Sequence, residues 1–422
     1  MRAITSLCVG LLLSVAAHSQ PPAVHAPGSP PAKIVLKAAR LFDGRSGKLS
    51  EPGVVVVEGE RIAAIRPAGG AADREAACVT PGLVNAHVHL EMSGEPDTMA
   101  FCATSTQNQR LLRAVENARK SLEAGVTTVR DVGSSHAIAQ DVRDAVDAGR
   151  IPGPRIRAAG YVLCMTGGHG WFLGRQVDGP WDARKAVREN LRDGADCIKT
   201  IATGGVLTRG AVPGNAQLTF DELEAAVDEA HRHGLKVASH AIGTEGIKNA
   251  LRAGVDSIEH GHMLDEEALA LFAQTGAYVV PTLTAPTCIL EHLADGGQPQ
   301  FVIDKARHVG EKMLVSIRRA FESGVKIAGG SDAGTPFNPH EGYAYEVELM
   351  QNLLGMSGRQ ALHAATAVAA ELIGLHRGIL AEGEPADLLL LDADIATDIR
   401  TLREPRAVIK AGAVVASRGP RA

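Results

Sequence analysis

The sequence predicts an α/β protein in which a (β/α)8 barrel of the TIM type is joined to a small β-sandwich domain formed by both ends of the chain. Residues 81–375 alternate eight times between strand-like and helix-like segments. Polar side chains stand at the ends of five of these strands, and β-rich segments flank the middle on both sides. A doubly wound open sheet is the alternative. Its ligands gather at one switch point, so it does not explain polar residues at so many strand ends.

Length and composition are those of a soluble globular protein. The chain has 422 residues, of which 45% are hydrophobic and 22% charged, enough for one large and one small domain. The net charge of −5 and the absence of a long basic run argue against a nucleic-acid partner. Six scattered cysteines without a CxxC pair exclude a disulfide framework and a thiolate zinc site.

The N-terminus has the pattern of a signal peptide, which we place at residues 1–19. Arg2 is the one charge in the first twenty residues, residues 7–17 are apolar, and Ala17 and Ser19 provide small side chains before a cut at Gln20. The apolar run is too short to span a membrane, although a retained N-terminal anchor is the alternative. We expect a flexible proline-rich leader over residues 20–32, and a periplasmic or secreted protein with no membrane association after signal removal.

Both flanks of the barrel read as β structure, residues 33–80 at one end and 376–422 at the other. The predicted strands are 34–38, 53–57 and 62–65 in the first flank, and an apolar run 386–392 and a hairpin over 408–415 in the second. The hairpin turns at Lys410-Ala411-Gly412. We expect one sheet assembly from the two flanks; two unrelated β flaps are the alternative.

The eight predicted barrel strands are Leu83–Leu90, Gly125–Val132, Arg155–Val162, Cys197–Thr203, Lys236–Ala241, Ser257–Met263, Ala277–Leu283 and Lys326–Ala333. Among the intervening helices, the one over residues 219–233 has the clearest signals. Thr219 and Glu222 form a capping box, apolar residues recur at helical spacing, and Gly234 is the stop.

The first barrel strand carries His87 and His89. Side chains two apart on a strand share a face, so the two imidazoles can bind one transition metal. A strand that merely contains two histidines is the alternative. The other polar strand ends are Lys199, His240, His260 and Asp332, on the fourth, fifth, sixth and eighth strands.

Each of these residues alone has an ordinary structural explanation. A strand-end histidine is often hydrogen-bonded in the core, and Lys199 could be half of an ion pair. A buried lysine is costly unless its charge is paired or removed. Because the active sites of such barrels lie at the carboxyl ends of the strands, the set together predicts a metal centre.

The motif His87-Val88-His89 with Lys199, His240, His260 and Asp332 resembles the metal ligands of the amidohydrolase superfamily. Within it, the chain resembles the metal-dependent amidases related to imidazolonepropionase and prolidase, including Xaa-amino-acid dipeptidases and bacterial ochratoxin-degrading amidohydrolases. The resemblance covers nearly everything after the leader. Supporting stretches are Leu41-Phe42-Asp43-Gly44, Pro81-Gly82-Leu83-Val84, residues 124–131, Thr203-Gly204-Gly205-Val206, Glu259-His260-Gly261 and residues 383–392.

The resemblance implies a binuclear zinc centre. In it, His87 and His89 hold one metal with Asp332, His240 and His260 hold the other, and N-carboxylated Lys199 bridges both. A metal-bridging hydroxide would attack the scissile carbonyl. Asp332 would take the water proton and pass it to the leaving amine, or serve as a ligand alone. A homo-oligomer acting on a small amide or dipeptide is also implied.

Two loops over the predicted barrel mouth carry candidate substrate-binding residues. His169 follows the third strand beside Trp171 and Phe172, which could form an apolar wall, and Arg209 follows the fourth strand and could hold a carboxylate. The alternatives are a glycine-rich loop packed on itself and a solvated arginine. We assign no role to three further strand-end histidines, His136, His262 and His340.

The leading functional hypothesis is hydrolysis of a carboxamide bond that releases an amino acid from dipeptides or N-acyl amino acids. Ochratoxin A, cleaved to ochratoxin alpha and phenylalanine, is a candidate substrate by resemblance. Lactone or cyclic-amide opening at the same site is the alternative, and a non-catalytic metal-binding scaffold is a remote one. Asp332 favours an enzyme, because a scaffold has no need of a base.

Overall fold

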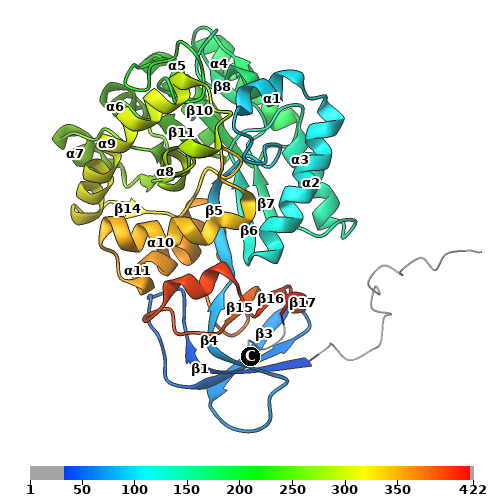
Figure 1. The fold of residues 1–422 in the computed structure, drawn as a ribbon. Coiled ribbons are helices and arrows are strands. Elements are labelled where there is room, and N and C mark those ends of the chain that lie inside the picture. The colour runs from blue at the N-terminus through cyan, green and yellow to red at the C-terminus, as the bar shows by residue number, and fades with distance from the viewer. Residues whose placement is uncertain (1–32, 419–422) are drawn as a thin grey trace, which may run out of the picture.

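The computed structural model describes residues 33–418, and the predicted signal peptide and leader lie outside them. Figure 1 shows a barrel wrapped by helices above a small β domain that contains both ends of the described chain. Within residues 33–418, no helix combines the length and apolarity needed to cross a membrane.

The barrel strands pair in parallel in sequence order, as predicted, within two sheets that meet where the third strand region breaks. They are β5 (Leu83–Val88), β6 (Val126–Asp131), β7 (Arg155–Ala158), β8 (Val162–Cys164), β10 (Cys197–Ile201), β11 (Lys236–Ala241), β12 (Ser257–His260), β13 (Tyr278–Val280) and β14 (Lys326–Ile327). A parallel bridge between Val88 and Ala333 joins the last strand region to the first, and the Asp332 amide donates to the His87 carbonyl at 2.9 Å. The ring of strands is therefore closed.

The third barrel strand differs from the single strand expected over Arg155–Val162. It breaks into β7, which pairs with β6, and β8, which pairs with β10 at Leu163 and Thr200. Gly160 lies at the break with a φ of +72°, a backbone conformation that L side chains rarely adopt. Because of the break, the first half of this strand region pairs with β6 and the second half pairs with β10.

The eighth strand is also shorter than predicted, with regular pairing over Lys326–Ile327 alone. The chain continues toward Asp332 through Gly329 and Gly330. A Cβ at Gly330 would lie 3.0 Å from the His87 Cβ, so glycine permits the backbone to approach the metal-site strand closely.

The helices surround the barrel. They are α1 (Thr98–Thr104), α2 (Gln107–Glu123), α3 (Ile138–Asp147), α4 (Pro180–Arg192), α5 (Phe220–Arg232), α6 (Thr244–Ala253), α7 (Glu266–Thr275), α8 (Thr284–Glu291), α9 (Gln300–Glu322), α10 (Tyr343–Leu354), α11 (Gly358–His363) and α12 (Ala369–Leu372). The predicted capping box of α5 is present: the Glu222 amide donates to Thr219 Oγ1 at 3.3 Å and the Thr219 amide to Glu222 Oε2 at 2.8 Å.

The small domain confirms that the two ends of the chain build one assembly. Its strands are β1 (Lys33–Leu41), β2 (Gly53–Glu58), β3 (Arg61–Pro67), β4 (Arg74–Pro81), β15 (Leu388–Leu391), β16 (Ala407–Lys410) and β17 (Ala413–Ser417). They form one sheet in the order β17-β16-β15-β4-β1-β2-β3. The Ile62 amide on edge strand β3 donates to the Glu384 carbonyl just before β15, so the sheet curls over its own core. The predicted hairpin is β16–β17, with Ala411 and Gly412 at positive φ in its turn.

Strand β4 continues into the first barrel strand through Pro81 and Gly82. A Cβ on Gly82 would meet the Thr127 side chain at 2.2 Å, so the turn packs directly against β6. This connection sets where β5 enters the barrel, and with it the position of His87 and His89 (Figure 1).

Candidate metal centre

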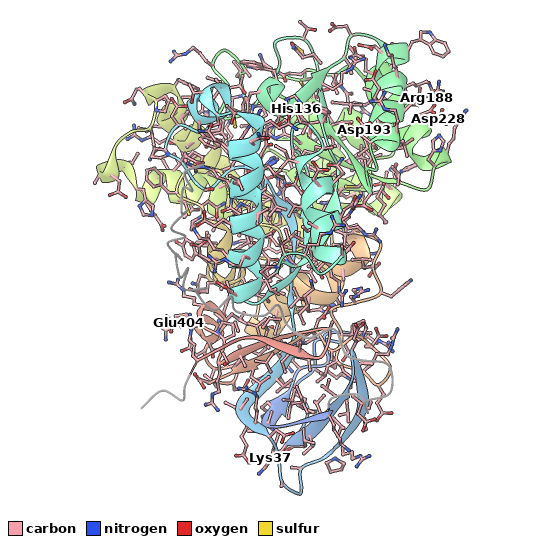
Figure 2. The ribbon with its side chains drawn as sticks, turned by 90° about the vertical axis from the view of Figure 1, so that its right-hand side faces the viewer. Lys37, His136, Arg188, Asp193, Asp228 and Glu404 are labelled. Atoms are coloured by element: carbon pink, nitrogen blue, oxygen red, sulfur yellow. The ribbon has the colours of Figure 1, made fainter. Side chains whose placement is uncertain are left out.

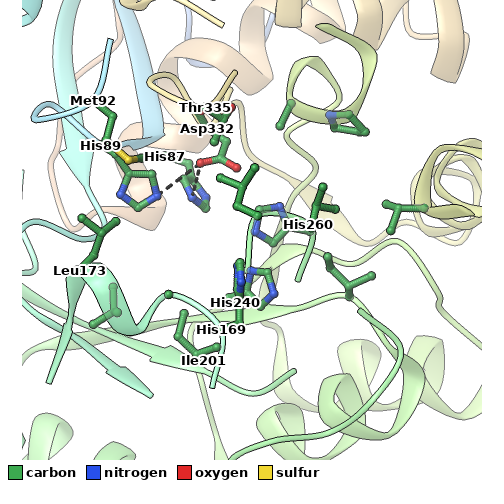
Figure 3. Close-up of a pocket in the computed structure, with 18 of the residues that line it drawn as sticks. His87, His89, Met92, His169, Leu173, Ile201, His240, His260, Asp332 and Thr335 are labelled. Carbon is green, nitrogen blue, oxygen red and sulfur yellow. Dashed lines mark hydrogen bonds and ion pairs between the residues drawn. The ribbon is translucent and has the colours of Figure 1, made fainter. Parts of the chain in front are cut away.

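Three of the predicted ligands meet at one point. His87 Nε2 and His89 Nε2 each lie 3.3 Å from Asp332 Oδ1, and the donor atoms of the three side chains are all within 4.8 Å of one another. Figure 3 shows both imidazoles turned toward the carboxylate. All three residues are buried. Two imidazoles and a carboxylate at this separation suit a transition metal such as zinc.

His240 and His260 extend this group on the far side of His87. Their ring centroids are 4.5 Å apart, and the His260 ring lies 5.2 Å from that of His87. Lys199, from β10, lines the same cavity. The structure therefore brings all six predicted ligands to one cavity at the carboxyl ends of the strands.

The two histidines of β5 are held by hydrogen bonds on the side away from the cavity. His87 Nδ1 donates to Glu259 Oε2 at 2.7 Å, and His89 Nδ1 donates to the Gly133 carbonyl at 2.8 Å. Arg130 in turn donates to Glu259 Oε1 at 2.9 Å. These outer partners turn Nε2 of each ring toward the cavity, and this is the nitrogen that would bind a metal.

The other two histidines have different outer partners. His260 Nδ1 pairs with Thr282 Oγ1 at 2.7 Å, again leaving Nε2 for a metal. His240 presents Nε2 to the Gly204 carbonyl at 3.0 Å, so its free nitrogen is Nδ1. The two rings thus offer different nitrogens to the same space.

Burial and neighbouring charges tune the ionisation of these groups. Burial lowers the pKa of His240 and of His260 well below the usual histidine value, so both rings keep lone pairs. Burial alone would raise the pKa of Asp332, but His87 and His89 hold it well below the usual range. Burial alone would likewise raise the pKa of Glu259, but Arg130 and the hydrogen-bonded His87 together lower it to about 2.

Lys199 is buried, and among residues 33–418 its ammonium has no hydrogen bond or ion pair. Burial lowers its pKa to about 8, so roughly a tenth of the amine is uncharged at pH 7, far more than for an exposed lysine. An uncharged amine is the form that can react with carbon dioxide to become a carbamate.

Two further observations show that these residues fit a metal centre. Asp332 Oδ1 is buried, and no hydrogen-bond donor reaches it from the described part of the chain. His260 and Asp332 have positive φ values of 77° and 59°, which cost free energy for residues with side chains. An orphaned buried acceptor and strain at two ligand positions are expected where a cation supplies the missing interaction.

The cavity around these residues has a volume of about 770 Å³, counted to its open mouth. Its polar lining comprises His87, His89, His169, Lys199, His240, His260, His262, Asp332 and Thr335. Much of the remaining wall is apolar: Val206 and Leu207 from the loop after β10, Ala285, Pro286 and Ile289 from α8, and Val309 from α9.

The two predicted substrate-binding residues lie in different surroundings. His169 lines the cavity, with its Nδ1 3.0 Å from Thr208 Oγ1 and its ring 4.5 Å from that of His240. Burial lowers the pKa of His169 to about 3, so the ring is neutral. Arg209 is exposed, stands outside the cavity lining, and places its guanidinium 4.5 Å from the centre of the Phe301 ring. Phe172 lines the cavity, whereas Trp171 is exposed.

The three histidines without an assigned role also lie in different surroundings. His262 lines the cavity and pairs through Nε2 with the Pro281 carbonyl at 3.0 Å. His340 is buried against the Met92 carbonyl. His136 lies at the surface, 3.1 Å from the Tyr161 hydroxyl (Figure 2).

Sequence reasoning missed the outer partners Glu259, Arg130 and Thr282. Glu259 had a local signal, because it is a charged residue directly before a metal-site histidine in an apolar strand. Its pairing with His87 joins positions 172 residues apart, and no local pattern encodes that.

Residues 78–415 match the amidohydrolase family. Ochratoxinase from Aspergillus niger is 31% identical over 360 residues, covering 78% of this chain and 73% of its own length. Imidazolonepropionase from Ectopseudomonas mendocina is 25% identical, covering 91% of this chain and 98% of its own. The crystal structure of a Xaa-Pro dipeptidase with methionine bound in its active site superposes with a TM-score of 0.83 at 34% identity, covering 91% and 99% of the two chains.

Proposed function

Because this chain belongs to the amidohydrolase family, a family of hydrolases, we propose that it is a metal-dependent amidase that releases an amino acid from dipeptides or N-acyl amino acids. The observation that carries the proposal is the convergence of His87, His89 and Asp332 on one point, with Lys199, His240 and His260 lining the same cavity. A non-catalytic scaffold would not need an ionised carboxylate facing the cavity.

The metals that these residues suit are two zinc ions. His87, His89 and Asp332 would hold one, His240 and His260 the other, and N-carboxylated Lys199 would contact both. Bound zinc ions would lower the pKa of a water molecule and polarise the scissile carbonyl.

Within the chain, Asp332 is the proton carrier. Its carboxylate stays ionised because of the adjacent imidazoles, so it can accept a proton from attacking water and deliver it to the leaving amine. His169, neutral and held by Thr208, lines the cavity where it can hydrogen-bond a substrate oxygen. The apolar walls exclude water, which strengthens each of these polar interactions.

The apolar lining of the cavity is an argument for an apolar substrate. Side chains of Val206, Leu207, Pro286, Ile289 and Val309 line the same cavity as the imidazoles. The similar Xaa-Pro dipeptidase has methionine bound in its active site, and another relative is an ochratoxinase. We therefore propose an α-amino acid with a free carboxylate as the leaving group, and ochratoxin A as a candidate beside ordinary hydrophobic dipeptides.

The decisive experiment combines metal analysis with turnover. Purified protein should contain two zinc ions per chain, lose activity on chelation and regain it with zinc. N-acetyl-phenylalanine-type substrates should be cleaved with a higher kcat/KM than the same compounds with a C-terminal amide. Equal values for the two would exclude a carboxylate preference, and preferential cleavage of lactones would show a lactonase instead.

A further inference from the structure

The loop between β10 and α5 builds one side of the cavity. In its first half, residues 204–211, Val206 and Leu207 line the cavity, and Thr208 contacts His169. A Cβ on Gly205 would lie 2.3 Å from His169 Nε2, so the loop backbone rests directly on that ring. The position of this loop therefore controls both the apolar wall and the orientation of His169.

One side chain of α9 makes three hydrogen bonds to the backbone of this loop. Lys305, on α9, directs its ammonium to the carbonyls of Gly205 at 3.1 Å, Thr208 at 2.6 Å and Ala211 at 2.5 Å. An ammonium has three donors, so the three carbonyls account for all of them. Hydrogen bonds from a charged donor are stronger than those between neutral groups.

The loop and α9 also share an apolar contact. Val206 and Leu207 pack against the cluster of Ile289, Val302 and Ala306, which α8 and α9 supply. Val302, Lys305 and Ala306 lie on adjacent turns of α9, so the apolar contact and the ammonium hold the loop from the same helix face.

We propose that Lys305 is a positioning residue that fixes residues 204–211 against α9, and that it thereby sets the enzyme's preference for amides with a bulky apolar group. This rests on the proposed amidase function. Without the ammonium, three carbonyls lose their charged donor and the wall formed by Val206 and Leu207 is free to shift. A bulky group that fills the cavity depends on that wall, whereas a small group does not reach it.

The test uses the full-length zinc-loaded protein with Lys305→Met and a matched control, Lys312→Met. Lys312 is an exposed lysine of the same helix whose ammonium contacts His308. The readouts are amide hydrogen exchange of residues 204–211, zinc content, and kcat/KM for a substrate pair that differs in one group, phenylalanine or glycine.

Lys305→Met should speed exchange of residues 204–211 by on the order of tenfold. It should lower kcat/KM for the phenylalanine substrate by on the order of tenfold, and for the glycine substrate by much less, because misplaced contacts weaken transition-state binding of the large group. Zinc content should stay at the wild-type value, and Lys312→Met should change none of the three readouts. A general loss of folding would instead lower kcat/KM for both substrates and the zinc content together.

If Lys305→Met does not fold, Lys305→Gln keeps two N–H donors and should show a smaller change in the same direction. Unchanged exchange of residues 204–211 in the variant that folds would overturn the proposed role of Lys305. Equal losses of kcat/KM for the two substrates would overturn it as well. If the wild-type protein cleaves no amide, the proposed function fails, but the exchange measurement still tests Lys305.

Discussion

At the scale of single residues, the site depends on where each side chain is held as much as on what it is. Asp332 reaches the imidazoles of His87 and His89 from a strained backbone position, and its Oδ1 accepts no hydrogen bond from the described residues. Lys199 stands in the same cavity, and no group within residues 33–418 forms a hydrogen bond with its ammonium. Holding these two side chains in the cavity costs free energy when no metal is bound, and metal binding would offset that cost.

Replacing Asp332 by Asn keeps the size of the side chain but removes its negative charge and its ability to accept a proton. We expect kcat to fall by several orders of magnitude, since a proton acceptor and a ligand are lost together, while part of the zinc remains bound. Steady-state kinetics with metal analysis measures this. Asp193→Asn, at the outer surface of the barrel (Figure 2), is the control and should behave as wild type. A loss of less than tenfold for Asp332→Asn would remove it from the mechanism.

Lys199→Met should remove the bridging ligand and most of the activity while the barrel still folds, because methionine fills the same buried space without a charge. Circular dichroism and zinc analysis should show native secondary structure with less than two zinc ions per chain. Lys37→Met in the exposed part of the small sheet (Figure 2) is the matched control. Near-normal turnover of Lys199→Met with two zinc ions bound would contradict the binuclear proposal.

At the scale of elements, helices behind the barrel hold the loops that carry the site. Glu346 on α10 is buried and accepts hydrogen bonds from the Leu283 amide at 2.9 Å and the Thr284 amide at 2.7 Å. That segment begins with Thr282, the partner of His260. Helix α10 therefore supports His260, one of the two histidines proposed to hold a second metal, through a single carboxyl group.

Burial raises the pKa of Glu346 from 4.5 to about 7. Because the folded state binds this proton more tightly than the unfolded state, the stabilising contribution is complete below pH 4.5 and is lost as pH rises toward 7. The free energy of unfolding of wild type minus that of Glu346→Gln should thus fall by about 2 kcal/mol between pH 5 and pH 7.5.

Urea unfolding at a series of pH values measures this difference. Glu341→Gln, at an exposed position just before α10, should leave the pH dependence of wild type unchanged. A wild-type minus Glu346→Gln difference that rises with pH would show that the Glu346 pKa is lowered rather than raised.

At the scale of the whole molecule, one strand of the small sheet contributes side chains to the cores of both domains. Strand β15 is buried on both faces: Leu388 and Leu390 belong to the core of the small sheet, whereas Leu389 and Leu391 belong to the barrel core. Strand β4, its neighbour, leads into β5 and the first two ligands. The two cores are thus coupled through β15 and cannot lose their packing independently.

Leu389→Ala and Leu390→Ala should therefore shift the same unfolding transition, although their side chains point into different cores. Each should cost about 2–5 kcal/mol, the usual range for a buried leucine replaced by alanine. Calorimetry and intrinsic fluorescence should report one transition for both variants, while Val415→Ala, on the outer strand β17 and 38% exposed, should change little. Two separated transitions in either variant would show that the cores unfold independently.

The sequence alone determined the features that depend on near neighbours along the chain. Alternation on β5 placed His87 and His89 on one face, the capping box placed the start of α5, and successive strand ends predicted the order of the remaining ligands. Each of these features follows from backbone geometry over a few residues, so it does not depend on contacts with distant parts of the chain.

The tertiary structure alone decided which atoms of those residues are available and what surrounds them. Glu259 selects the free nitrogen of His87 across 172 residues, and Lys305 holds the Gly205 carbonyl across 100. Arg209, predicted from its place after a strand, lies over Phe301 outside the cavity lining. Such contacts form between segments that meet only when the barrel closes, so their partners carry no local pattern. The physical reason is that hydrogen bonding and burial depend on distances in the folded structure, and separation along the sequence does not give those distances.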